Sequence, residues 1–515
     1  MLRSRASRSL GALPSTSSLT AVRGFRATRP AEVGPLIAGV GVAVAAYSLK
    51  LMLQAAANPK FQEAMRETAE RAQAAATPSR SAERQGAPSA AASKPASYFT
   101  TDVMGVDLGQ GAKDWSSACV AVVEDGEARV VPNAQGVRHT PSMVAFQDDG
   151  ELVGQPAKKL LFSRTAAVVH GHQLLLGLPY ASDECAEVAK ALPHLDIAAA
   201  DPADADAAAA IMVHGVAHSP ADISARVLRL LKGNAEDALG GRSVLCAVVG
   251  VPVDASAPLR AALEAAGRRA GLRQLELIAE PVAAATAAEA GELASELAGA
   301  GTIGVYSLGG RSFSFSVLRR AAEGSAEEAA AAAAAAQPGW EVVAAQSERL
   351  LGSEAFDEML VAELVADFKQ SEGIDLSSDH LAMGRLHEAA ENAKAELCSS
   401  ASSRISLPFI TADASGPKHM ELTLSRARWA AVVAPQLQRT LPVCEAALAA
   451  ASVSASDLDA VLLLGGSARA PALQQLVQQL CGGKEPLRLA RPEESIALGA
   501  AAHARALQAA QYQEA

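Results

Sequence analysis

The segment that decides the fold is Val103-Met-Gly-Val-Asp-Leu-Gly109, an apolar run that ends in a carboxylate and a glycine. Such a run predicts a buried strand followed by a tight turn. The next apolar run, Ala118 to Val123, predicts the antiparallel partner of that strand. The same strand–turn–strand pattern returns at Gly301 to Leu308 and Phe313 to Leu318 around Ser307-Leu-Gly-Gly310. The sequence therefore predicts two β-hairpins of the same kind.

Further core elements surround these hairpins. Ser243 to Val251 predicts a buried strand, Pro258 to Ala270 a helix, and Ala460 to Leu464 a last core strand that ends in Gly465-Gly466. Glycine turns let backbone N–H groups approach phosphate oxygens, and a carboxylate at a strand end can organise Mg²⁺ through water. Three such turns indicate an α/β fold that resembles the actin-like ATPase fold, with two lobes around a central nucleotide cleft.

Other segments carry a more specific resemblance, to the heat-shock 70 kDa (Hsp70) chaperone family. They are Val103–Gly109, Asn133–Ser142, Leu152–Lys158, Ile278–Ala285, Glu372–Leu376, Glu388–Lys394, Leu407–His419 and Leu464–Arg469. Leu407–His419 is close to the bacterial and mitochondrial branch. The resemblance covers Val103 to Arg505 and implies a nucleotide-binding domain over residues 101–508, with a first lobe at about 103–295 and a second at about 300–508. Because the sequence ends at Ala515, we expect no peptide-binding domain and no direct peptide-client groove.

The resemblance also implies which residues carry the chemistry. Asp107 and Glu280 match catalytic carboxylates of the family. Gln173 stands where the family has a lysine that positions the reacting phosphate, and Ser307 and Ser314 stand where it has two aspartates. Loss of one preorganised group commonly lowers the rate of a reaction by about 10²–10³-fold. We therefore expect a weak or inactive ATPase, in effect a pseudo-ATPase. We also expect it to hold Mg²⁺ less well than the family does.

Two more departures affect the phosphate turns. Gln110 and Gly111 replace two threonines that touch phosphate in the family, and an insertion through Trp115 lengthens the turn. Arg311 occupies a position where the family has glycine, and its charge could partly replace the missing lysine. This leaves a working ATPase with rebuilt phosphate turns as an alternative.

The adenosine side matches the family better, so ATP or ADP binding is expected. Cys398 stands where the family has serine. The full set of nucleotide-binding candidates implied by the resemblance is Gly109, Gly309, Gly310, Arg311, Ser312, Glu391, Lys394, Gly465, Gly466, Ser467, Arg469 and Glu493. No metal-ligating motif is predicted: His170 and His172 form an H-x-H pair of the kind usually found on a surface.

The first hundred residues differ from the rest. Residues 1–30 combine six arginines with no acidic residue, which is typical of a mitochondrial transit peptide, with a plastid signal as the alternative. Residues 33–57 are uncharged apart from Lys50 and mostly apolar, and they predict a transmembrane helix in the inner membrane, with the large domain in the matrix; a soluble matrix protein is the alternative. Residues 58–100 predict a helix and a flexible linker.

Composition restricts the remaining functions. The net charge of −11 argues against a nucleic-acid partner. Six scattered cysteines suggest reduced thiols. The leading hypothesis is a membrane-tethered regulator or scaffold in protein import, folding or membrane-complex assembly. Its expected partners are J-proteins, a nucleotide-exchange factor or an inner-membrane complex. A structural subunit of an inner-membrane complex remains an alternative.

Overall fold

The structure is a computed structural model that describes residues 102–109, 117–148, 150–161, 166–204, 206–321 and 339–514. The chain divides into two units, Met1–Lys94 and Pro95–Ala515, and every described residue belongs to the second. The predicted transit peptide, membrane helix and linker, and the position of Gln110, lie outside the described residues. Within the described ranges, no helix has the length and apolar character needed to cross a bilayer.

The first lobe is built on a five-stranded sheet with the order β11-β10-β1-β2-β3. Its strands are β1 (Asp102–Asp107), β2 (Cys119–Glu124), β3 (Glu127–Val130), β10 (Val244–Val251) and β11 (Gln274–Ala279). The predicted hairpin is confirmed, because β1 pairs antiparallel with β2. Strands β1, β10 and β11 run parallel, so their carboxyl ends meet at one edge of the sheet.

The second lobe repeats this scheme with a four-stranded sheet of order β14-β13-β12-β17. Its strands are β12 (Thr302–Leu308), β13 (Ser312–Arg320), β14 (Trp340–Arg349) and β17 (Ala460–Leu464). Strand β12 pairs antiparallel with β13 and parallel with β17, so the second predicted hairpin and the predicted last core strand are confirmed.

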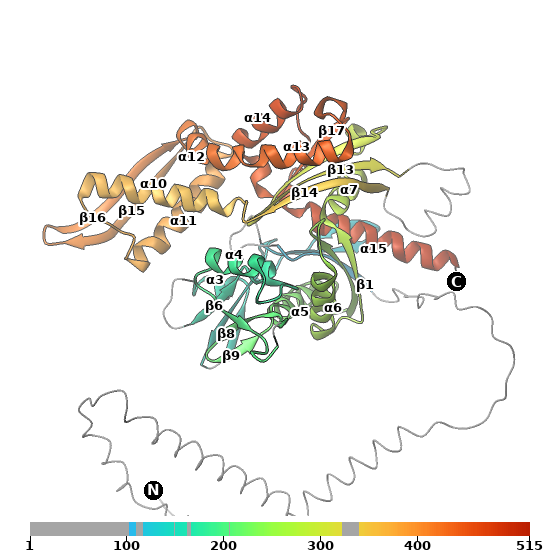
Figure 1. The fold of residues 1–515 in the computed structure, drawn as a ribbon, viewed down its shortest axis with the longest axis horizontal. Coiled ribbons are helices and arrows are strands. Elements are labelled where there is room, and N and C mark those ends of the chain that lie inside the picture. The colour runs from blue at the N-terminus through green and yellow to red at the C-terminus, as the bar shows by residue number, and fades with distance from the viewer. Residues whose placement is uncertain are drawn as a thin grey trace, which may run out of the picture. The chain divides into compact units, whose positions relative to one another are not determined.

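Two alanine-rich helices, α7 (Glu280–Ala290) and α15 (Ser495–Glu514), pack between the two sheets. Their approach is close: a Cβ atom at Gly105 would lie 2.2 Å from the nitrogen of Ala501, and one at Gly499 would lie 1.7 Å from the oxygen of Ala283. Although α15 follows the second lobe in sequence, it packs on β1, β2 and β10 of the first. Figure 1 shows this last helix crossing from the upper group of elements to the lower sheet.

The remaining elements of the first lobe flank its sheet. Two small sheets have the orders β5-β4-β6 and β7-β8-β9. Helix α5 begins at a capping box in which the Ser219 and Asp222 side chains each accept a backbone N–H bond from the other residue. The bounds are β4 (Met143–Gln147), β5 (Gly150–Val153), β6 (Ala167–His170), β7 (Asp196–Ala199), β8 (Ala209–Val213), β9 (Val216–His218), α3 (Gln155–Lys158), η3 (His172–Leu175), α4 (Asp183–Ala191), α5 (Pro220–Ala238), α6 (Ala257–Arg269) and α8 (Ala294–Leu297).

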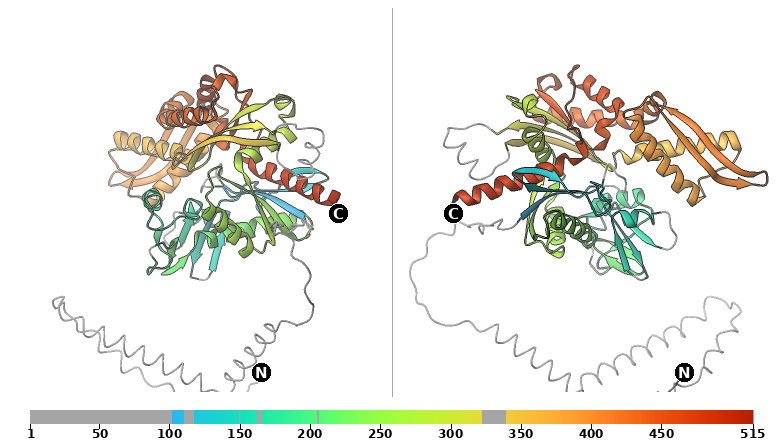
Figure 2. Two further views of the ribbon diagram at one scale, coloured as in Figure 1. Left: turned by 45° about the vertical axis from the view of Figure 1, so that its right-hand side comes forward. Right: turned by 180° about the vertical axis from the view of Figure 1, so that it is seen from behind.

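The second lobe is completed by a long hairpin and helices. Figure 2 shows the β15–β16 hairpin projecting from this lobe, beside α10 and α11. The bounds are α10 (Glu354–Glu372), α11 (His380–Leu397), β15 (Ser402–Asp413), β16 (Gly416–Ser425), α12 (Arg426–Gln438), α13 (Thr440–Ala451), η4 (Ala455–Asp457), η5 (Gly466–Arg469), α14 (Pro471–Leu480) and η6 (Pro492–Glu494). The whole is a mixed α/β fold with two sheet-centred lobes, consistent with the actin-like architecture.

Candidate functional site

A cleft lies where the two central sheets face each other at their strand ends. The structure brings Asp107, Ser307 and Gly465 together in it, from the ends of β1, β12 and β17. The polar and glycine residues that line it are Asp107, Gly109, Ser117, Gln173, Asp254, Glu280, Ser307, Gly309, Gly310, Ser312, Ser314, Ser347, Glu348, Arg349, Gly465 and Glu493.

Carboxylates form the wall of the cleft on the first lobe. Asp107 ends β1, Asp254 follows β10, and Glu280 follows β11, so three parallel neighbours place their acids at one edge. Desolvation raises the pKa of Asp107 to about 6, although the Gly109 N–H donates to its Oδ1 at 2.8 Å. Desolvation, and then the charges of Asp107 and Asp254, raise the pKa of Glu280 to about 8. This wall of the cleft therefore presents three neighbouring carboxyl groups, which accept hydrogen bonds when they are ionised.

Serines form the facing wall on the second lobe. Ser307 on β12 lies opposite Ser314 on β13, and Ser314 lies opposite Ser347 on β14. The Ser347 hydroxyl donates to Oδ2 of Asp254 across the cleft at 2.5 Å. The positions that the resemblance assigns to two aspartates are therefore part of a neutral hydroxyl row.

The cleft holds little positive charge. Among the described residues that line it, the basic side chain is Arg349, which pairs with Glu184 at 3.1 Å. Glu348 and Glu493 are paired with Arg439 and Arg469 outside the lining set. The first-lobe carboxylates have no basic partner among the described residues. A polyphosphate in this cleft would meet unfavourable charge unless cations accompanied it.

Gln173 lines the cleft beside the first glycine turn. It lies on η3, with the side chain buried, and its Nε2 donates to the carbonyl of Gly109 at 2.9 Å and to Oγ of Ser142 at 2.6 Å. These acceptors fix which end of the amide is nitrogen. Its Oε1 is buried and accepts no hydrogen bond from the described residues. The amide thus ties η3 to the first glycine turn and brings no charge.

Arg311 is directed away from this set. Its Nε lies 2.9 Å from Oε2 of Glu354, with both side chains largely buried. The same turn is fixed by two backbone bonds, from the Ser353 and Glu354 N–H groups at the start of α10 to the carbonyls of Gly309 and Gly310. Arg311 does not line the cleft in this conformation, so the structure gives no support to the idea that it replaces the missing lysine.

Two adenosine-side candidates from α11 form ion pairs. Lys394 lies 2.7 Å from Asp357 of α10, and both are buried. Glu391 lies 3.4 Å from Lys158 of α3, which joins the two lobes. The interaction of each with a nucleotide stays a prediction.

The glycine loop after β17 approaches the end of β12 closely. Gly465 has φ of 82°, and a Cβ there would lie 2.5 Å from the oxygen of Leu308. Gly466, Ser467 and Arg469 form η5, and Arg469 pairs with Glu493 at 2.5 Å. Oγ of Ser467 and Oε2 of Glu493 are buried without a hydrogen-bond partner among the described residues. Buried polar atoms are normally satisfied, so these atoms fit a polar ligand.

His170 and His172 are buried, so their expected place on the surface was wrong. His172 lies 3.1 Å from Oγ of Ser224, and burial lowers its pKa to about 3. Cys398 is partly buried, and burial raises the pKa of its thiol to about 11.

The model of the Hsp70 protein family matches residues 103–514. The chain therefore belongs to the Hsp70 family. Members of this family are chaperones that bind ATP and ADP and typically interact with J-proteins and exchange factors.

Sequence reasoning missed Asp254 and Ser347. Asp254 carried a usable signal, because it follows a strand that had been predicted, and acids at the carboxyl ends of parallel strands often share a site. Ser347 carried none, because its place opposite Ser314 depends on the register of β14.

Proposed function

We propose that this Hsp70-family protein binds adenine nucleotide weakly, hydrolyses ATP at or near the uncatalysed rate, and serves as a regulator or scaffold for chaperone partners. The observation that carries the proposal is the charge of the cleft. Asp107, Asp254 and Glu280 face a row of serines, and Gln173 supplies a neutral amide between them. The cleft resembles a nucleotide site, but among the described residues that line it the one basic side chain is Arg349, which is paired with Glu184.

Phosphoryl transfer depends on positioning and on stabilisation of charge in the transition state. Gln173 can donate hydrogen bonds but cannot offset phosphate charge, and its nitrogen is already engaged with Gly109 and Ser142. Asp107 and Glu280 are suited to hold the water shell of Mg²⁺, which would supply the missing positive charge when bound. With raised pKa values, however, both acids carry less negative charge near neutral pH than ordinary carboxylates.

The adenosine end supports binding without turnover. Ser467 and Glu493 offer buried polar atoms without protein partners, next to the close turn at Gly465. A nucleotide held there would stabilise the arrangement of the lobes to which it binds, without being consumed. Such a protein regulates its partners by its conformational state.

For partners and location, we propose J-proteins or an exchange factor, and attachment to the mitochondrial inner membrane with the domain in the matrix. The family membership supports the partners, and the arginine-rich start and the apolar residues 33–57 support the location. Cross-linking and purification from detergent-solubilised mitochondria tests the partners. Release by alkaline carbonate would exclude the anchor, and digestion of the domain by protease in intact mitoplasts would reverse the orientation.

The chemistry is tested by restoring the missing groups. The triple variant Gln173→Lys, Ser307→Asp, Ser314→Asp should acquire Mg²⁺-dependent ATP turnover that the unmodified protein lacks. A matched triple variant, Gln173→Met, Ser307→Asn, Ser314→Asn, should remain inactive. Turnover in the unmodified chain equal to that of the restored variant would contradict the proposal.

A further inference from the structure

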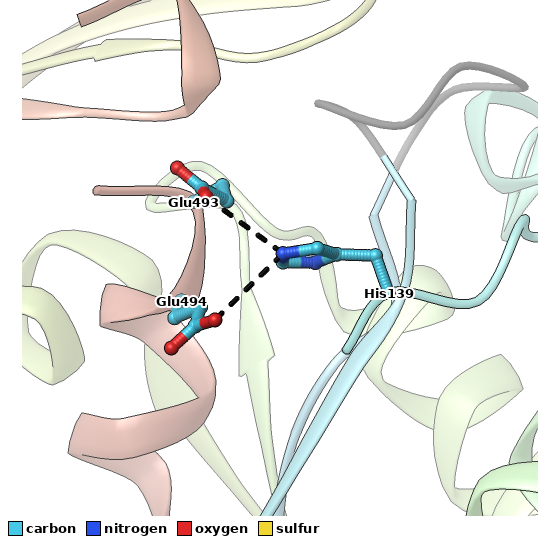
Figure 3. Close-up of side chains that lie close together, drawn as sticks. All are labelled: His139, Glu493 and Glu494. Carbon is cyan, nitrogen blue, oxygen red and sulfur yellow. Dashed lines mark ion pairs between the residues drawn. The ribbon is translucent and has the colours of Figure 1, made fainter. Parts of the chain in front are cut away.

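An imidazole and two successive carboxylates meet outside the phosphate end of the cleft. His139 lies in the segment between β3 and β4, and Glu493 and Glu494 lie in η6, where the chain passes from the second lobe to α15. Figure 3 shows the imidazole of His139 directed between the two carboxylates. Its Nε2 is 3.8 Å from Oε1 of Glu493 and 3.9 Å from Oε1 of Glu494.

These separations are too long for direct hydrogen bonds, which rarely exceed about 3.2 Å. One potential ligand atom from each residue lies within 4.8 Å of the others. Two ligands of one tetrahedral zinc ion, with bonds of about 2.0–2.2 Å, lie about 3.4 Å apart. A contraction of roughly 0.5 Å would bring Nε2 to that spacing from each of the two oxygens. The three atoms are therefore close enough to converge on one ion after a small movement of the side chains.

Burial makes the cluster unusual for a surface contact. The exposed fractions of the side chains are 15% for His139, 9% for Glu493 and 3% for Glu494. Oε2 of Glu493 is buried and accepts no hydrogen bond from the described residues. This carboxylate therefore has binding capacity that the described part of the protein does not use.

Arginines donate to both carboxylates, including the two Oε1 atoms that lie nearest His139. Arg138 donates to the two oxygens of Glu494 at 2.5 and 2.7 Å, and Arg469 donates to Oε1 of Glu493 at 2.5 Å. Contacts of this kind orient a ligating carboxylate, and a carboxylate oxygen has a second lone pair for a metal. Nη1 of Arg491 also lies 3.8 Å from Oε1 of Glu494, so three guanidinium groups offset the two negative charges. An ion here must be held by coordinate bonds more than by net charge.

The need for strong coordinate bonds favours one kind of metal ion over the others. Mg²⁺ and Ca²⁺ take several oxygen ligands and depend on negative charge. Zn²⁺ accepts mixed nitrogen and oxygen ligands and keeps high affinity for imidazole. We propose that His139, Glu493 and Glu494 form a zinc site, completed by water, that joins the segment after β3 to the crossover before α15.

Zinc binding at this site would influence the nucleotide cleft. Glu493 lines the cleft and pairs with Arg469 of η5. An ion that draws Glu493 toward His139 competes with that pair and moves the loop next to Ser467. The proposal does not depend on whether the cleft hydrolyses ATP.

The test uses the purified full chain with ZnCl₂ in equilibrium dialysis. The unmodified protein should bind one zinc ion, and His139→Gln or Glu493→Gln should each weaken binding by at least about 10-fold. The matched control is His214→Gln, a histidine in the exposed turn between β8 and β9, which should bind as the unmodified protein does. Zinc should raise the thermal midpoint of the unmodified chain and of the control, but not of the two ligand variants.

Cobalt(II) gives an independent readout on the unmodified chain, in case a variant fails to fold. Its complex should show the weak visible bands of nitrogen and oxygen ligation without a thiolate charge-transfer band. A thiolate band would place the ion on a cysteine and overturn the assignment. Absence of stoichiometric zinc, or equal zinc affinity in His139→Gln, would overturn it as well.

Discussion

The side-chain amide of Gln173 donates a hydrogen bond to the backbone carbonyl of Gly109 at 2.9 Å. This bond fixes the first glycine turn against η3 from inside the cleft. It also commits the nitrogen of Gln173 to the protein, at the place where the resemblance assigns a phosphate-positioning lysine. The phosphate end is therefore ordered by a neutral group.

Gln173→Lys should strengthen ATP binding by about 10-fold, a gain of about 1.4 kcal/mol, because an ammonium group would offset the acids that share the cleft. Isothermal titration calorimetry measures the change. Gln173→Met removes the amide without adding charge and should give no gain. Equal affinities in the lysine and methionine variants would mean that charge at this position is irrelevant.

Glu280 should make the protein less stable as pH rises. Its pKa is raised from 4.5 to about 8, so the folded state binds more protons than the unfolded state within that window. The free energy of unfolding is therefore greatest near the lower end of this pH window and falls as the pH rises through the window. Glu280→Gln should stabilise the protein by on the order of 1–3 kcal/mol at about pH 9 and change little at about pH 4.

Denaturant unfolding across this pH range checks the effect of Glu280. Glu187→Gln, at an exposed position of α4, provides the control and should leave the pH profile unchanged. A Glu280→Gln profile parallel to that of the unmodified protein would show that the carboxyl ionises freely in the cleft.

Lys394→Met should destabilise the second lobe by about 3–5 kcal/mol, because it removes the ammonium group that lies 2.7 Å from the buried carboxylate of Asp357. The double variant Lys394→Met, Asp357→Leu removes both charges and should recover most of that loss. Urea unfolding of the two variants measures the difference. The prediction fails if the double variant is no more stable than Lys394→Met.

Gly499→Ala should loosen the packing of α15 on α7, since the added Cβ would lie 1.7 Å from the oxygen of Ala283. The expected loss is about 1–3 kcal/mol or more. Gly233→Ala in α5 is the matched control: a Cβ there meets nothing within 4 Å, and the change should stabilise by about 0.4–1 kcal/mol. Thermal midpoints that shift equally in both variants would contradict this packing.

The central strands could be predicted from sequence because apolar runs and glycine turns are local signals. Strand β1, its hairpin partner β2, and strand β17 before Gly465 all lie where the pattern indicated. Side-chain partners could not be predicted in this way. Arg311 was predicted to contact phosphate, but it pairs with Glu354. Glu354 begins α10, which follows strand β14 in the sequence, so this pair depends on how α10 packs against the glycine turn.

The burial of His172 also escaped prediction, because spacing of two residues says nothing about what covers a segment. Its place against Ser224 depends on the packing of η3 on α5. Asp254 was the avoidable omission, because the strand that ends before it had been predicted. The part that Asp254 plays in the cleft became clear only from the order of the strands, which places it beside Asp107 and Glu280.

The central claim is that the cleft does not catalyse ATP hydrolysis, and steady-state ATP turnover by the purified, unmodified chain with Mg²⁺ tests it most directly. The account predicts a rate equal to the protein-free background and equal to that of Asp107→Ala. Mg²⁺-dependent turnover above background that Asp107→Ala abolishes would contradict it.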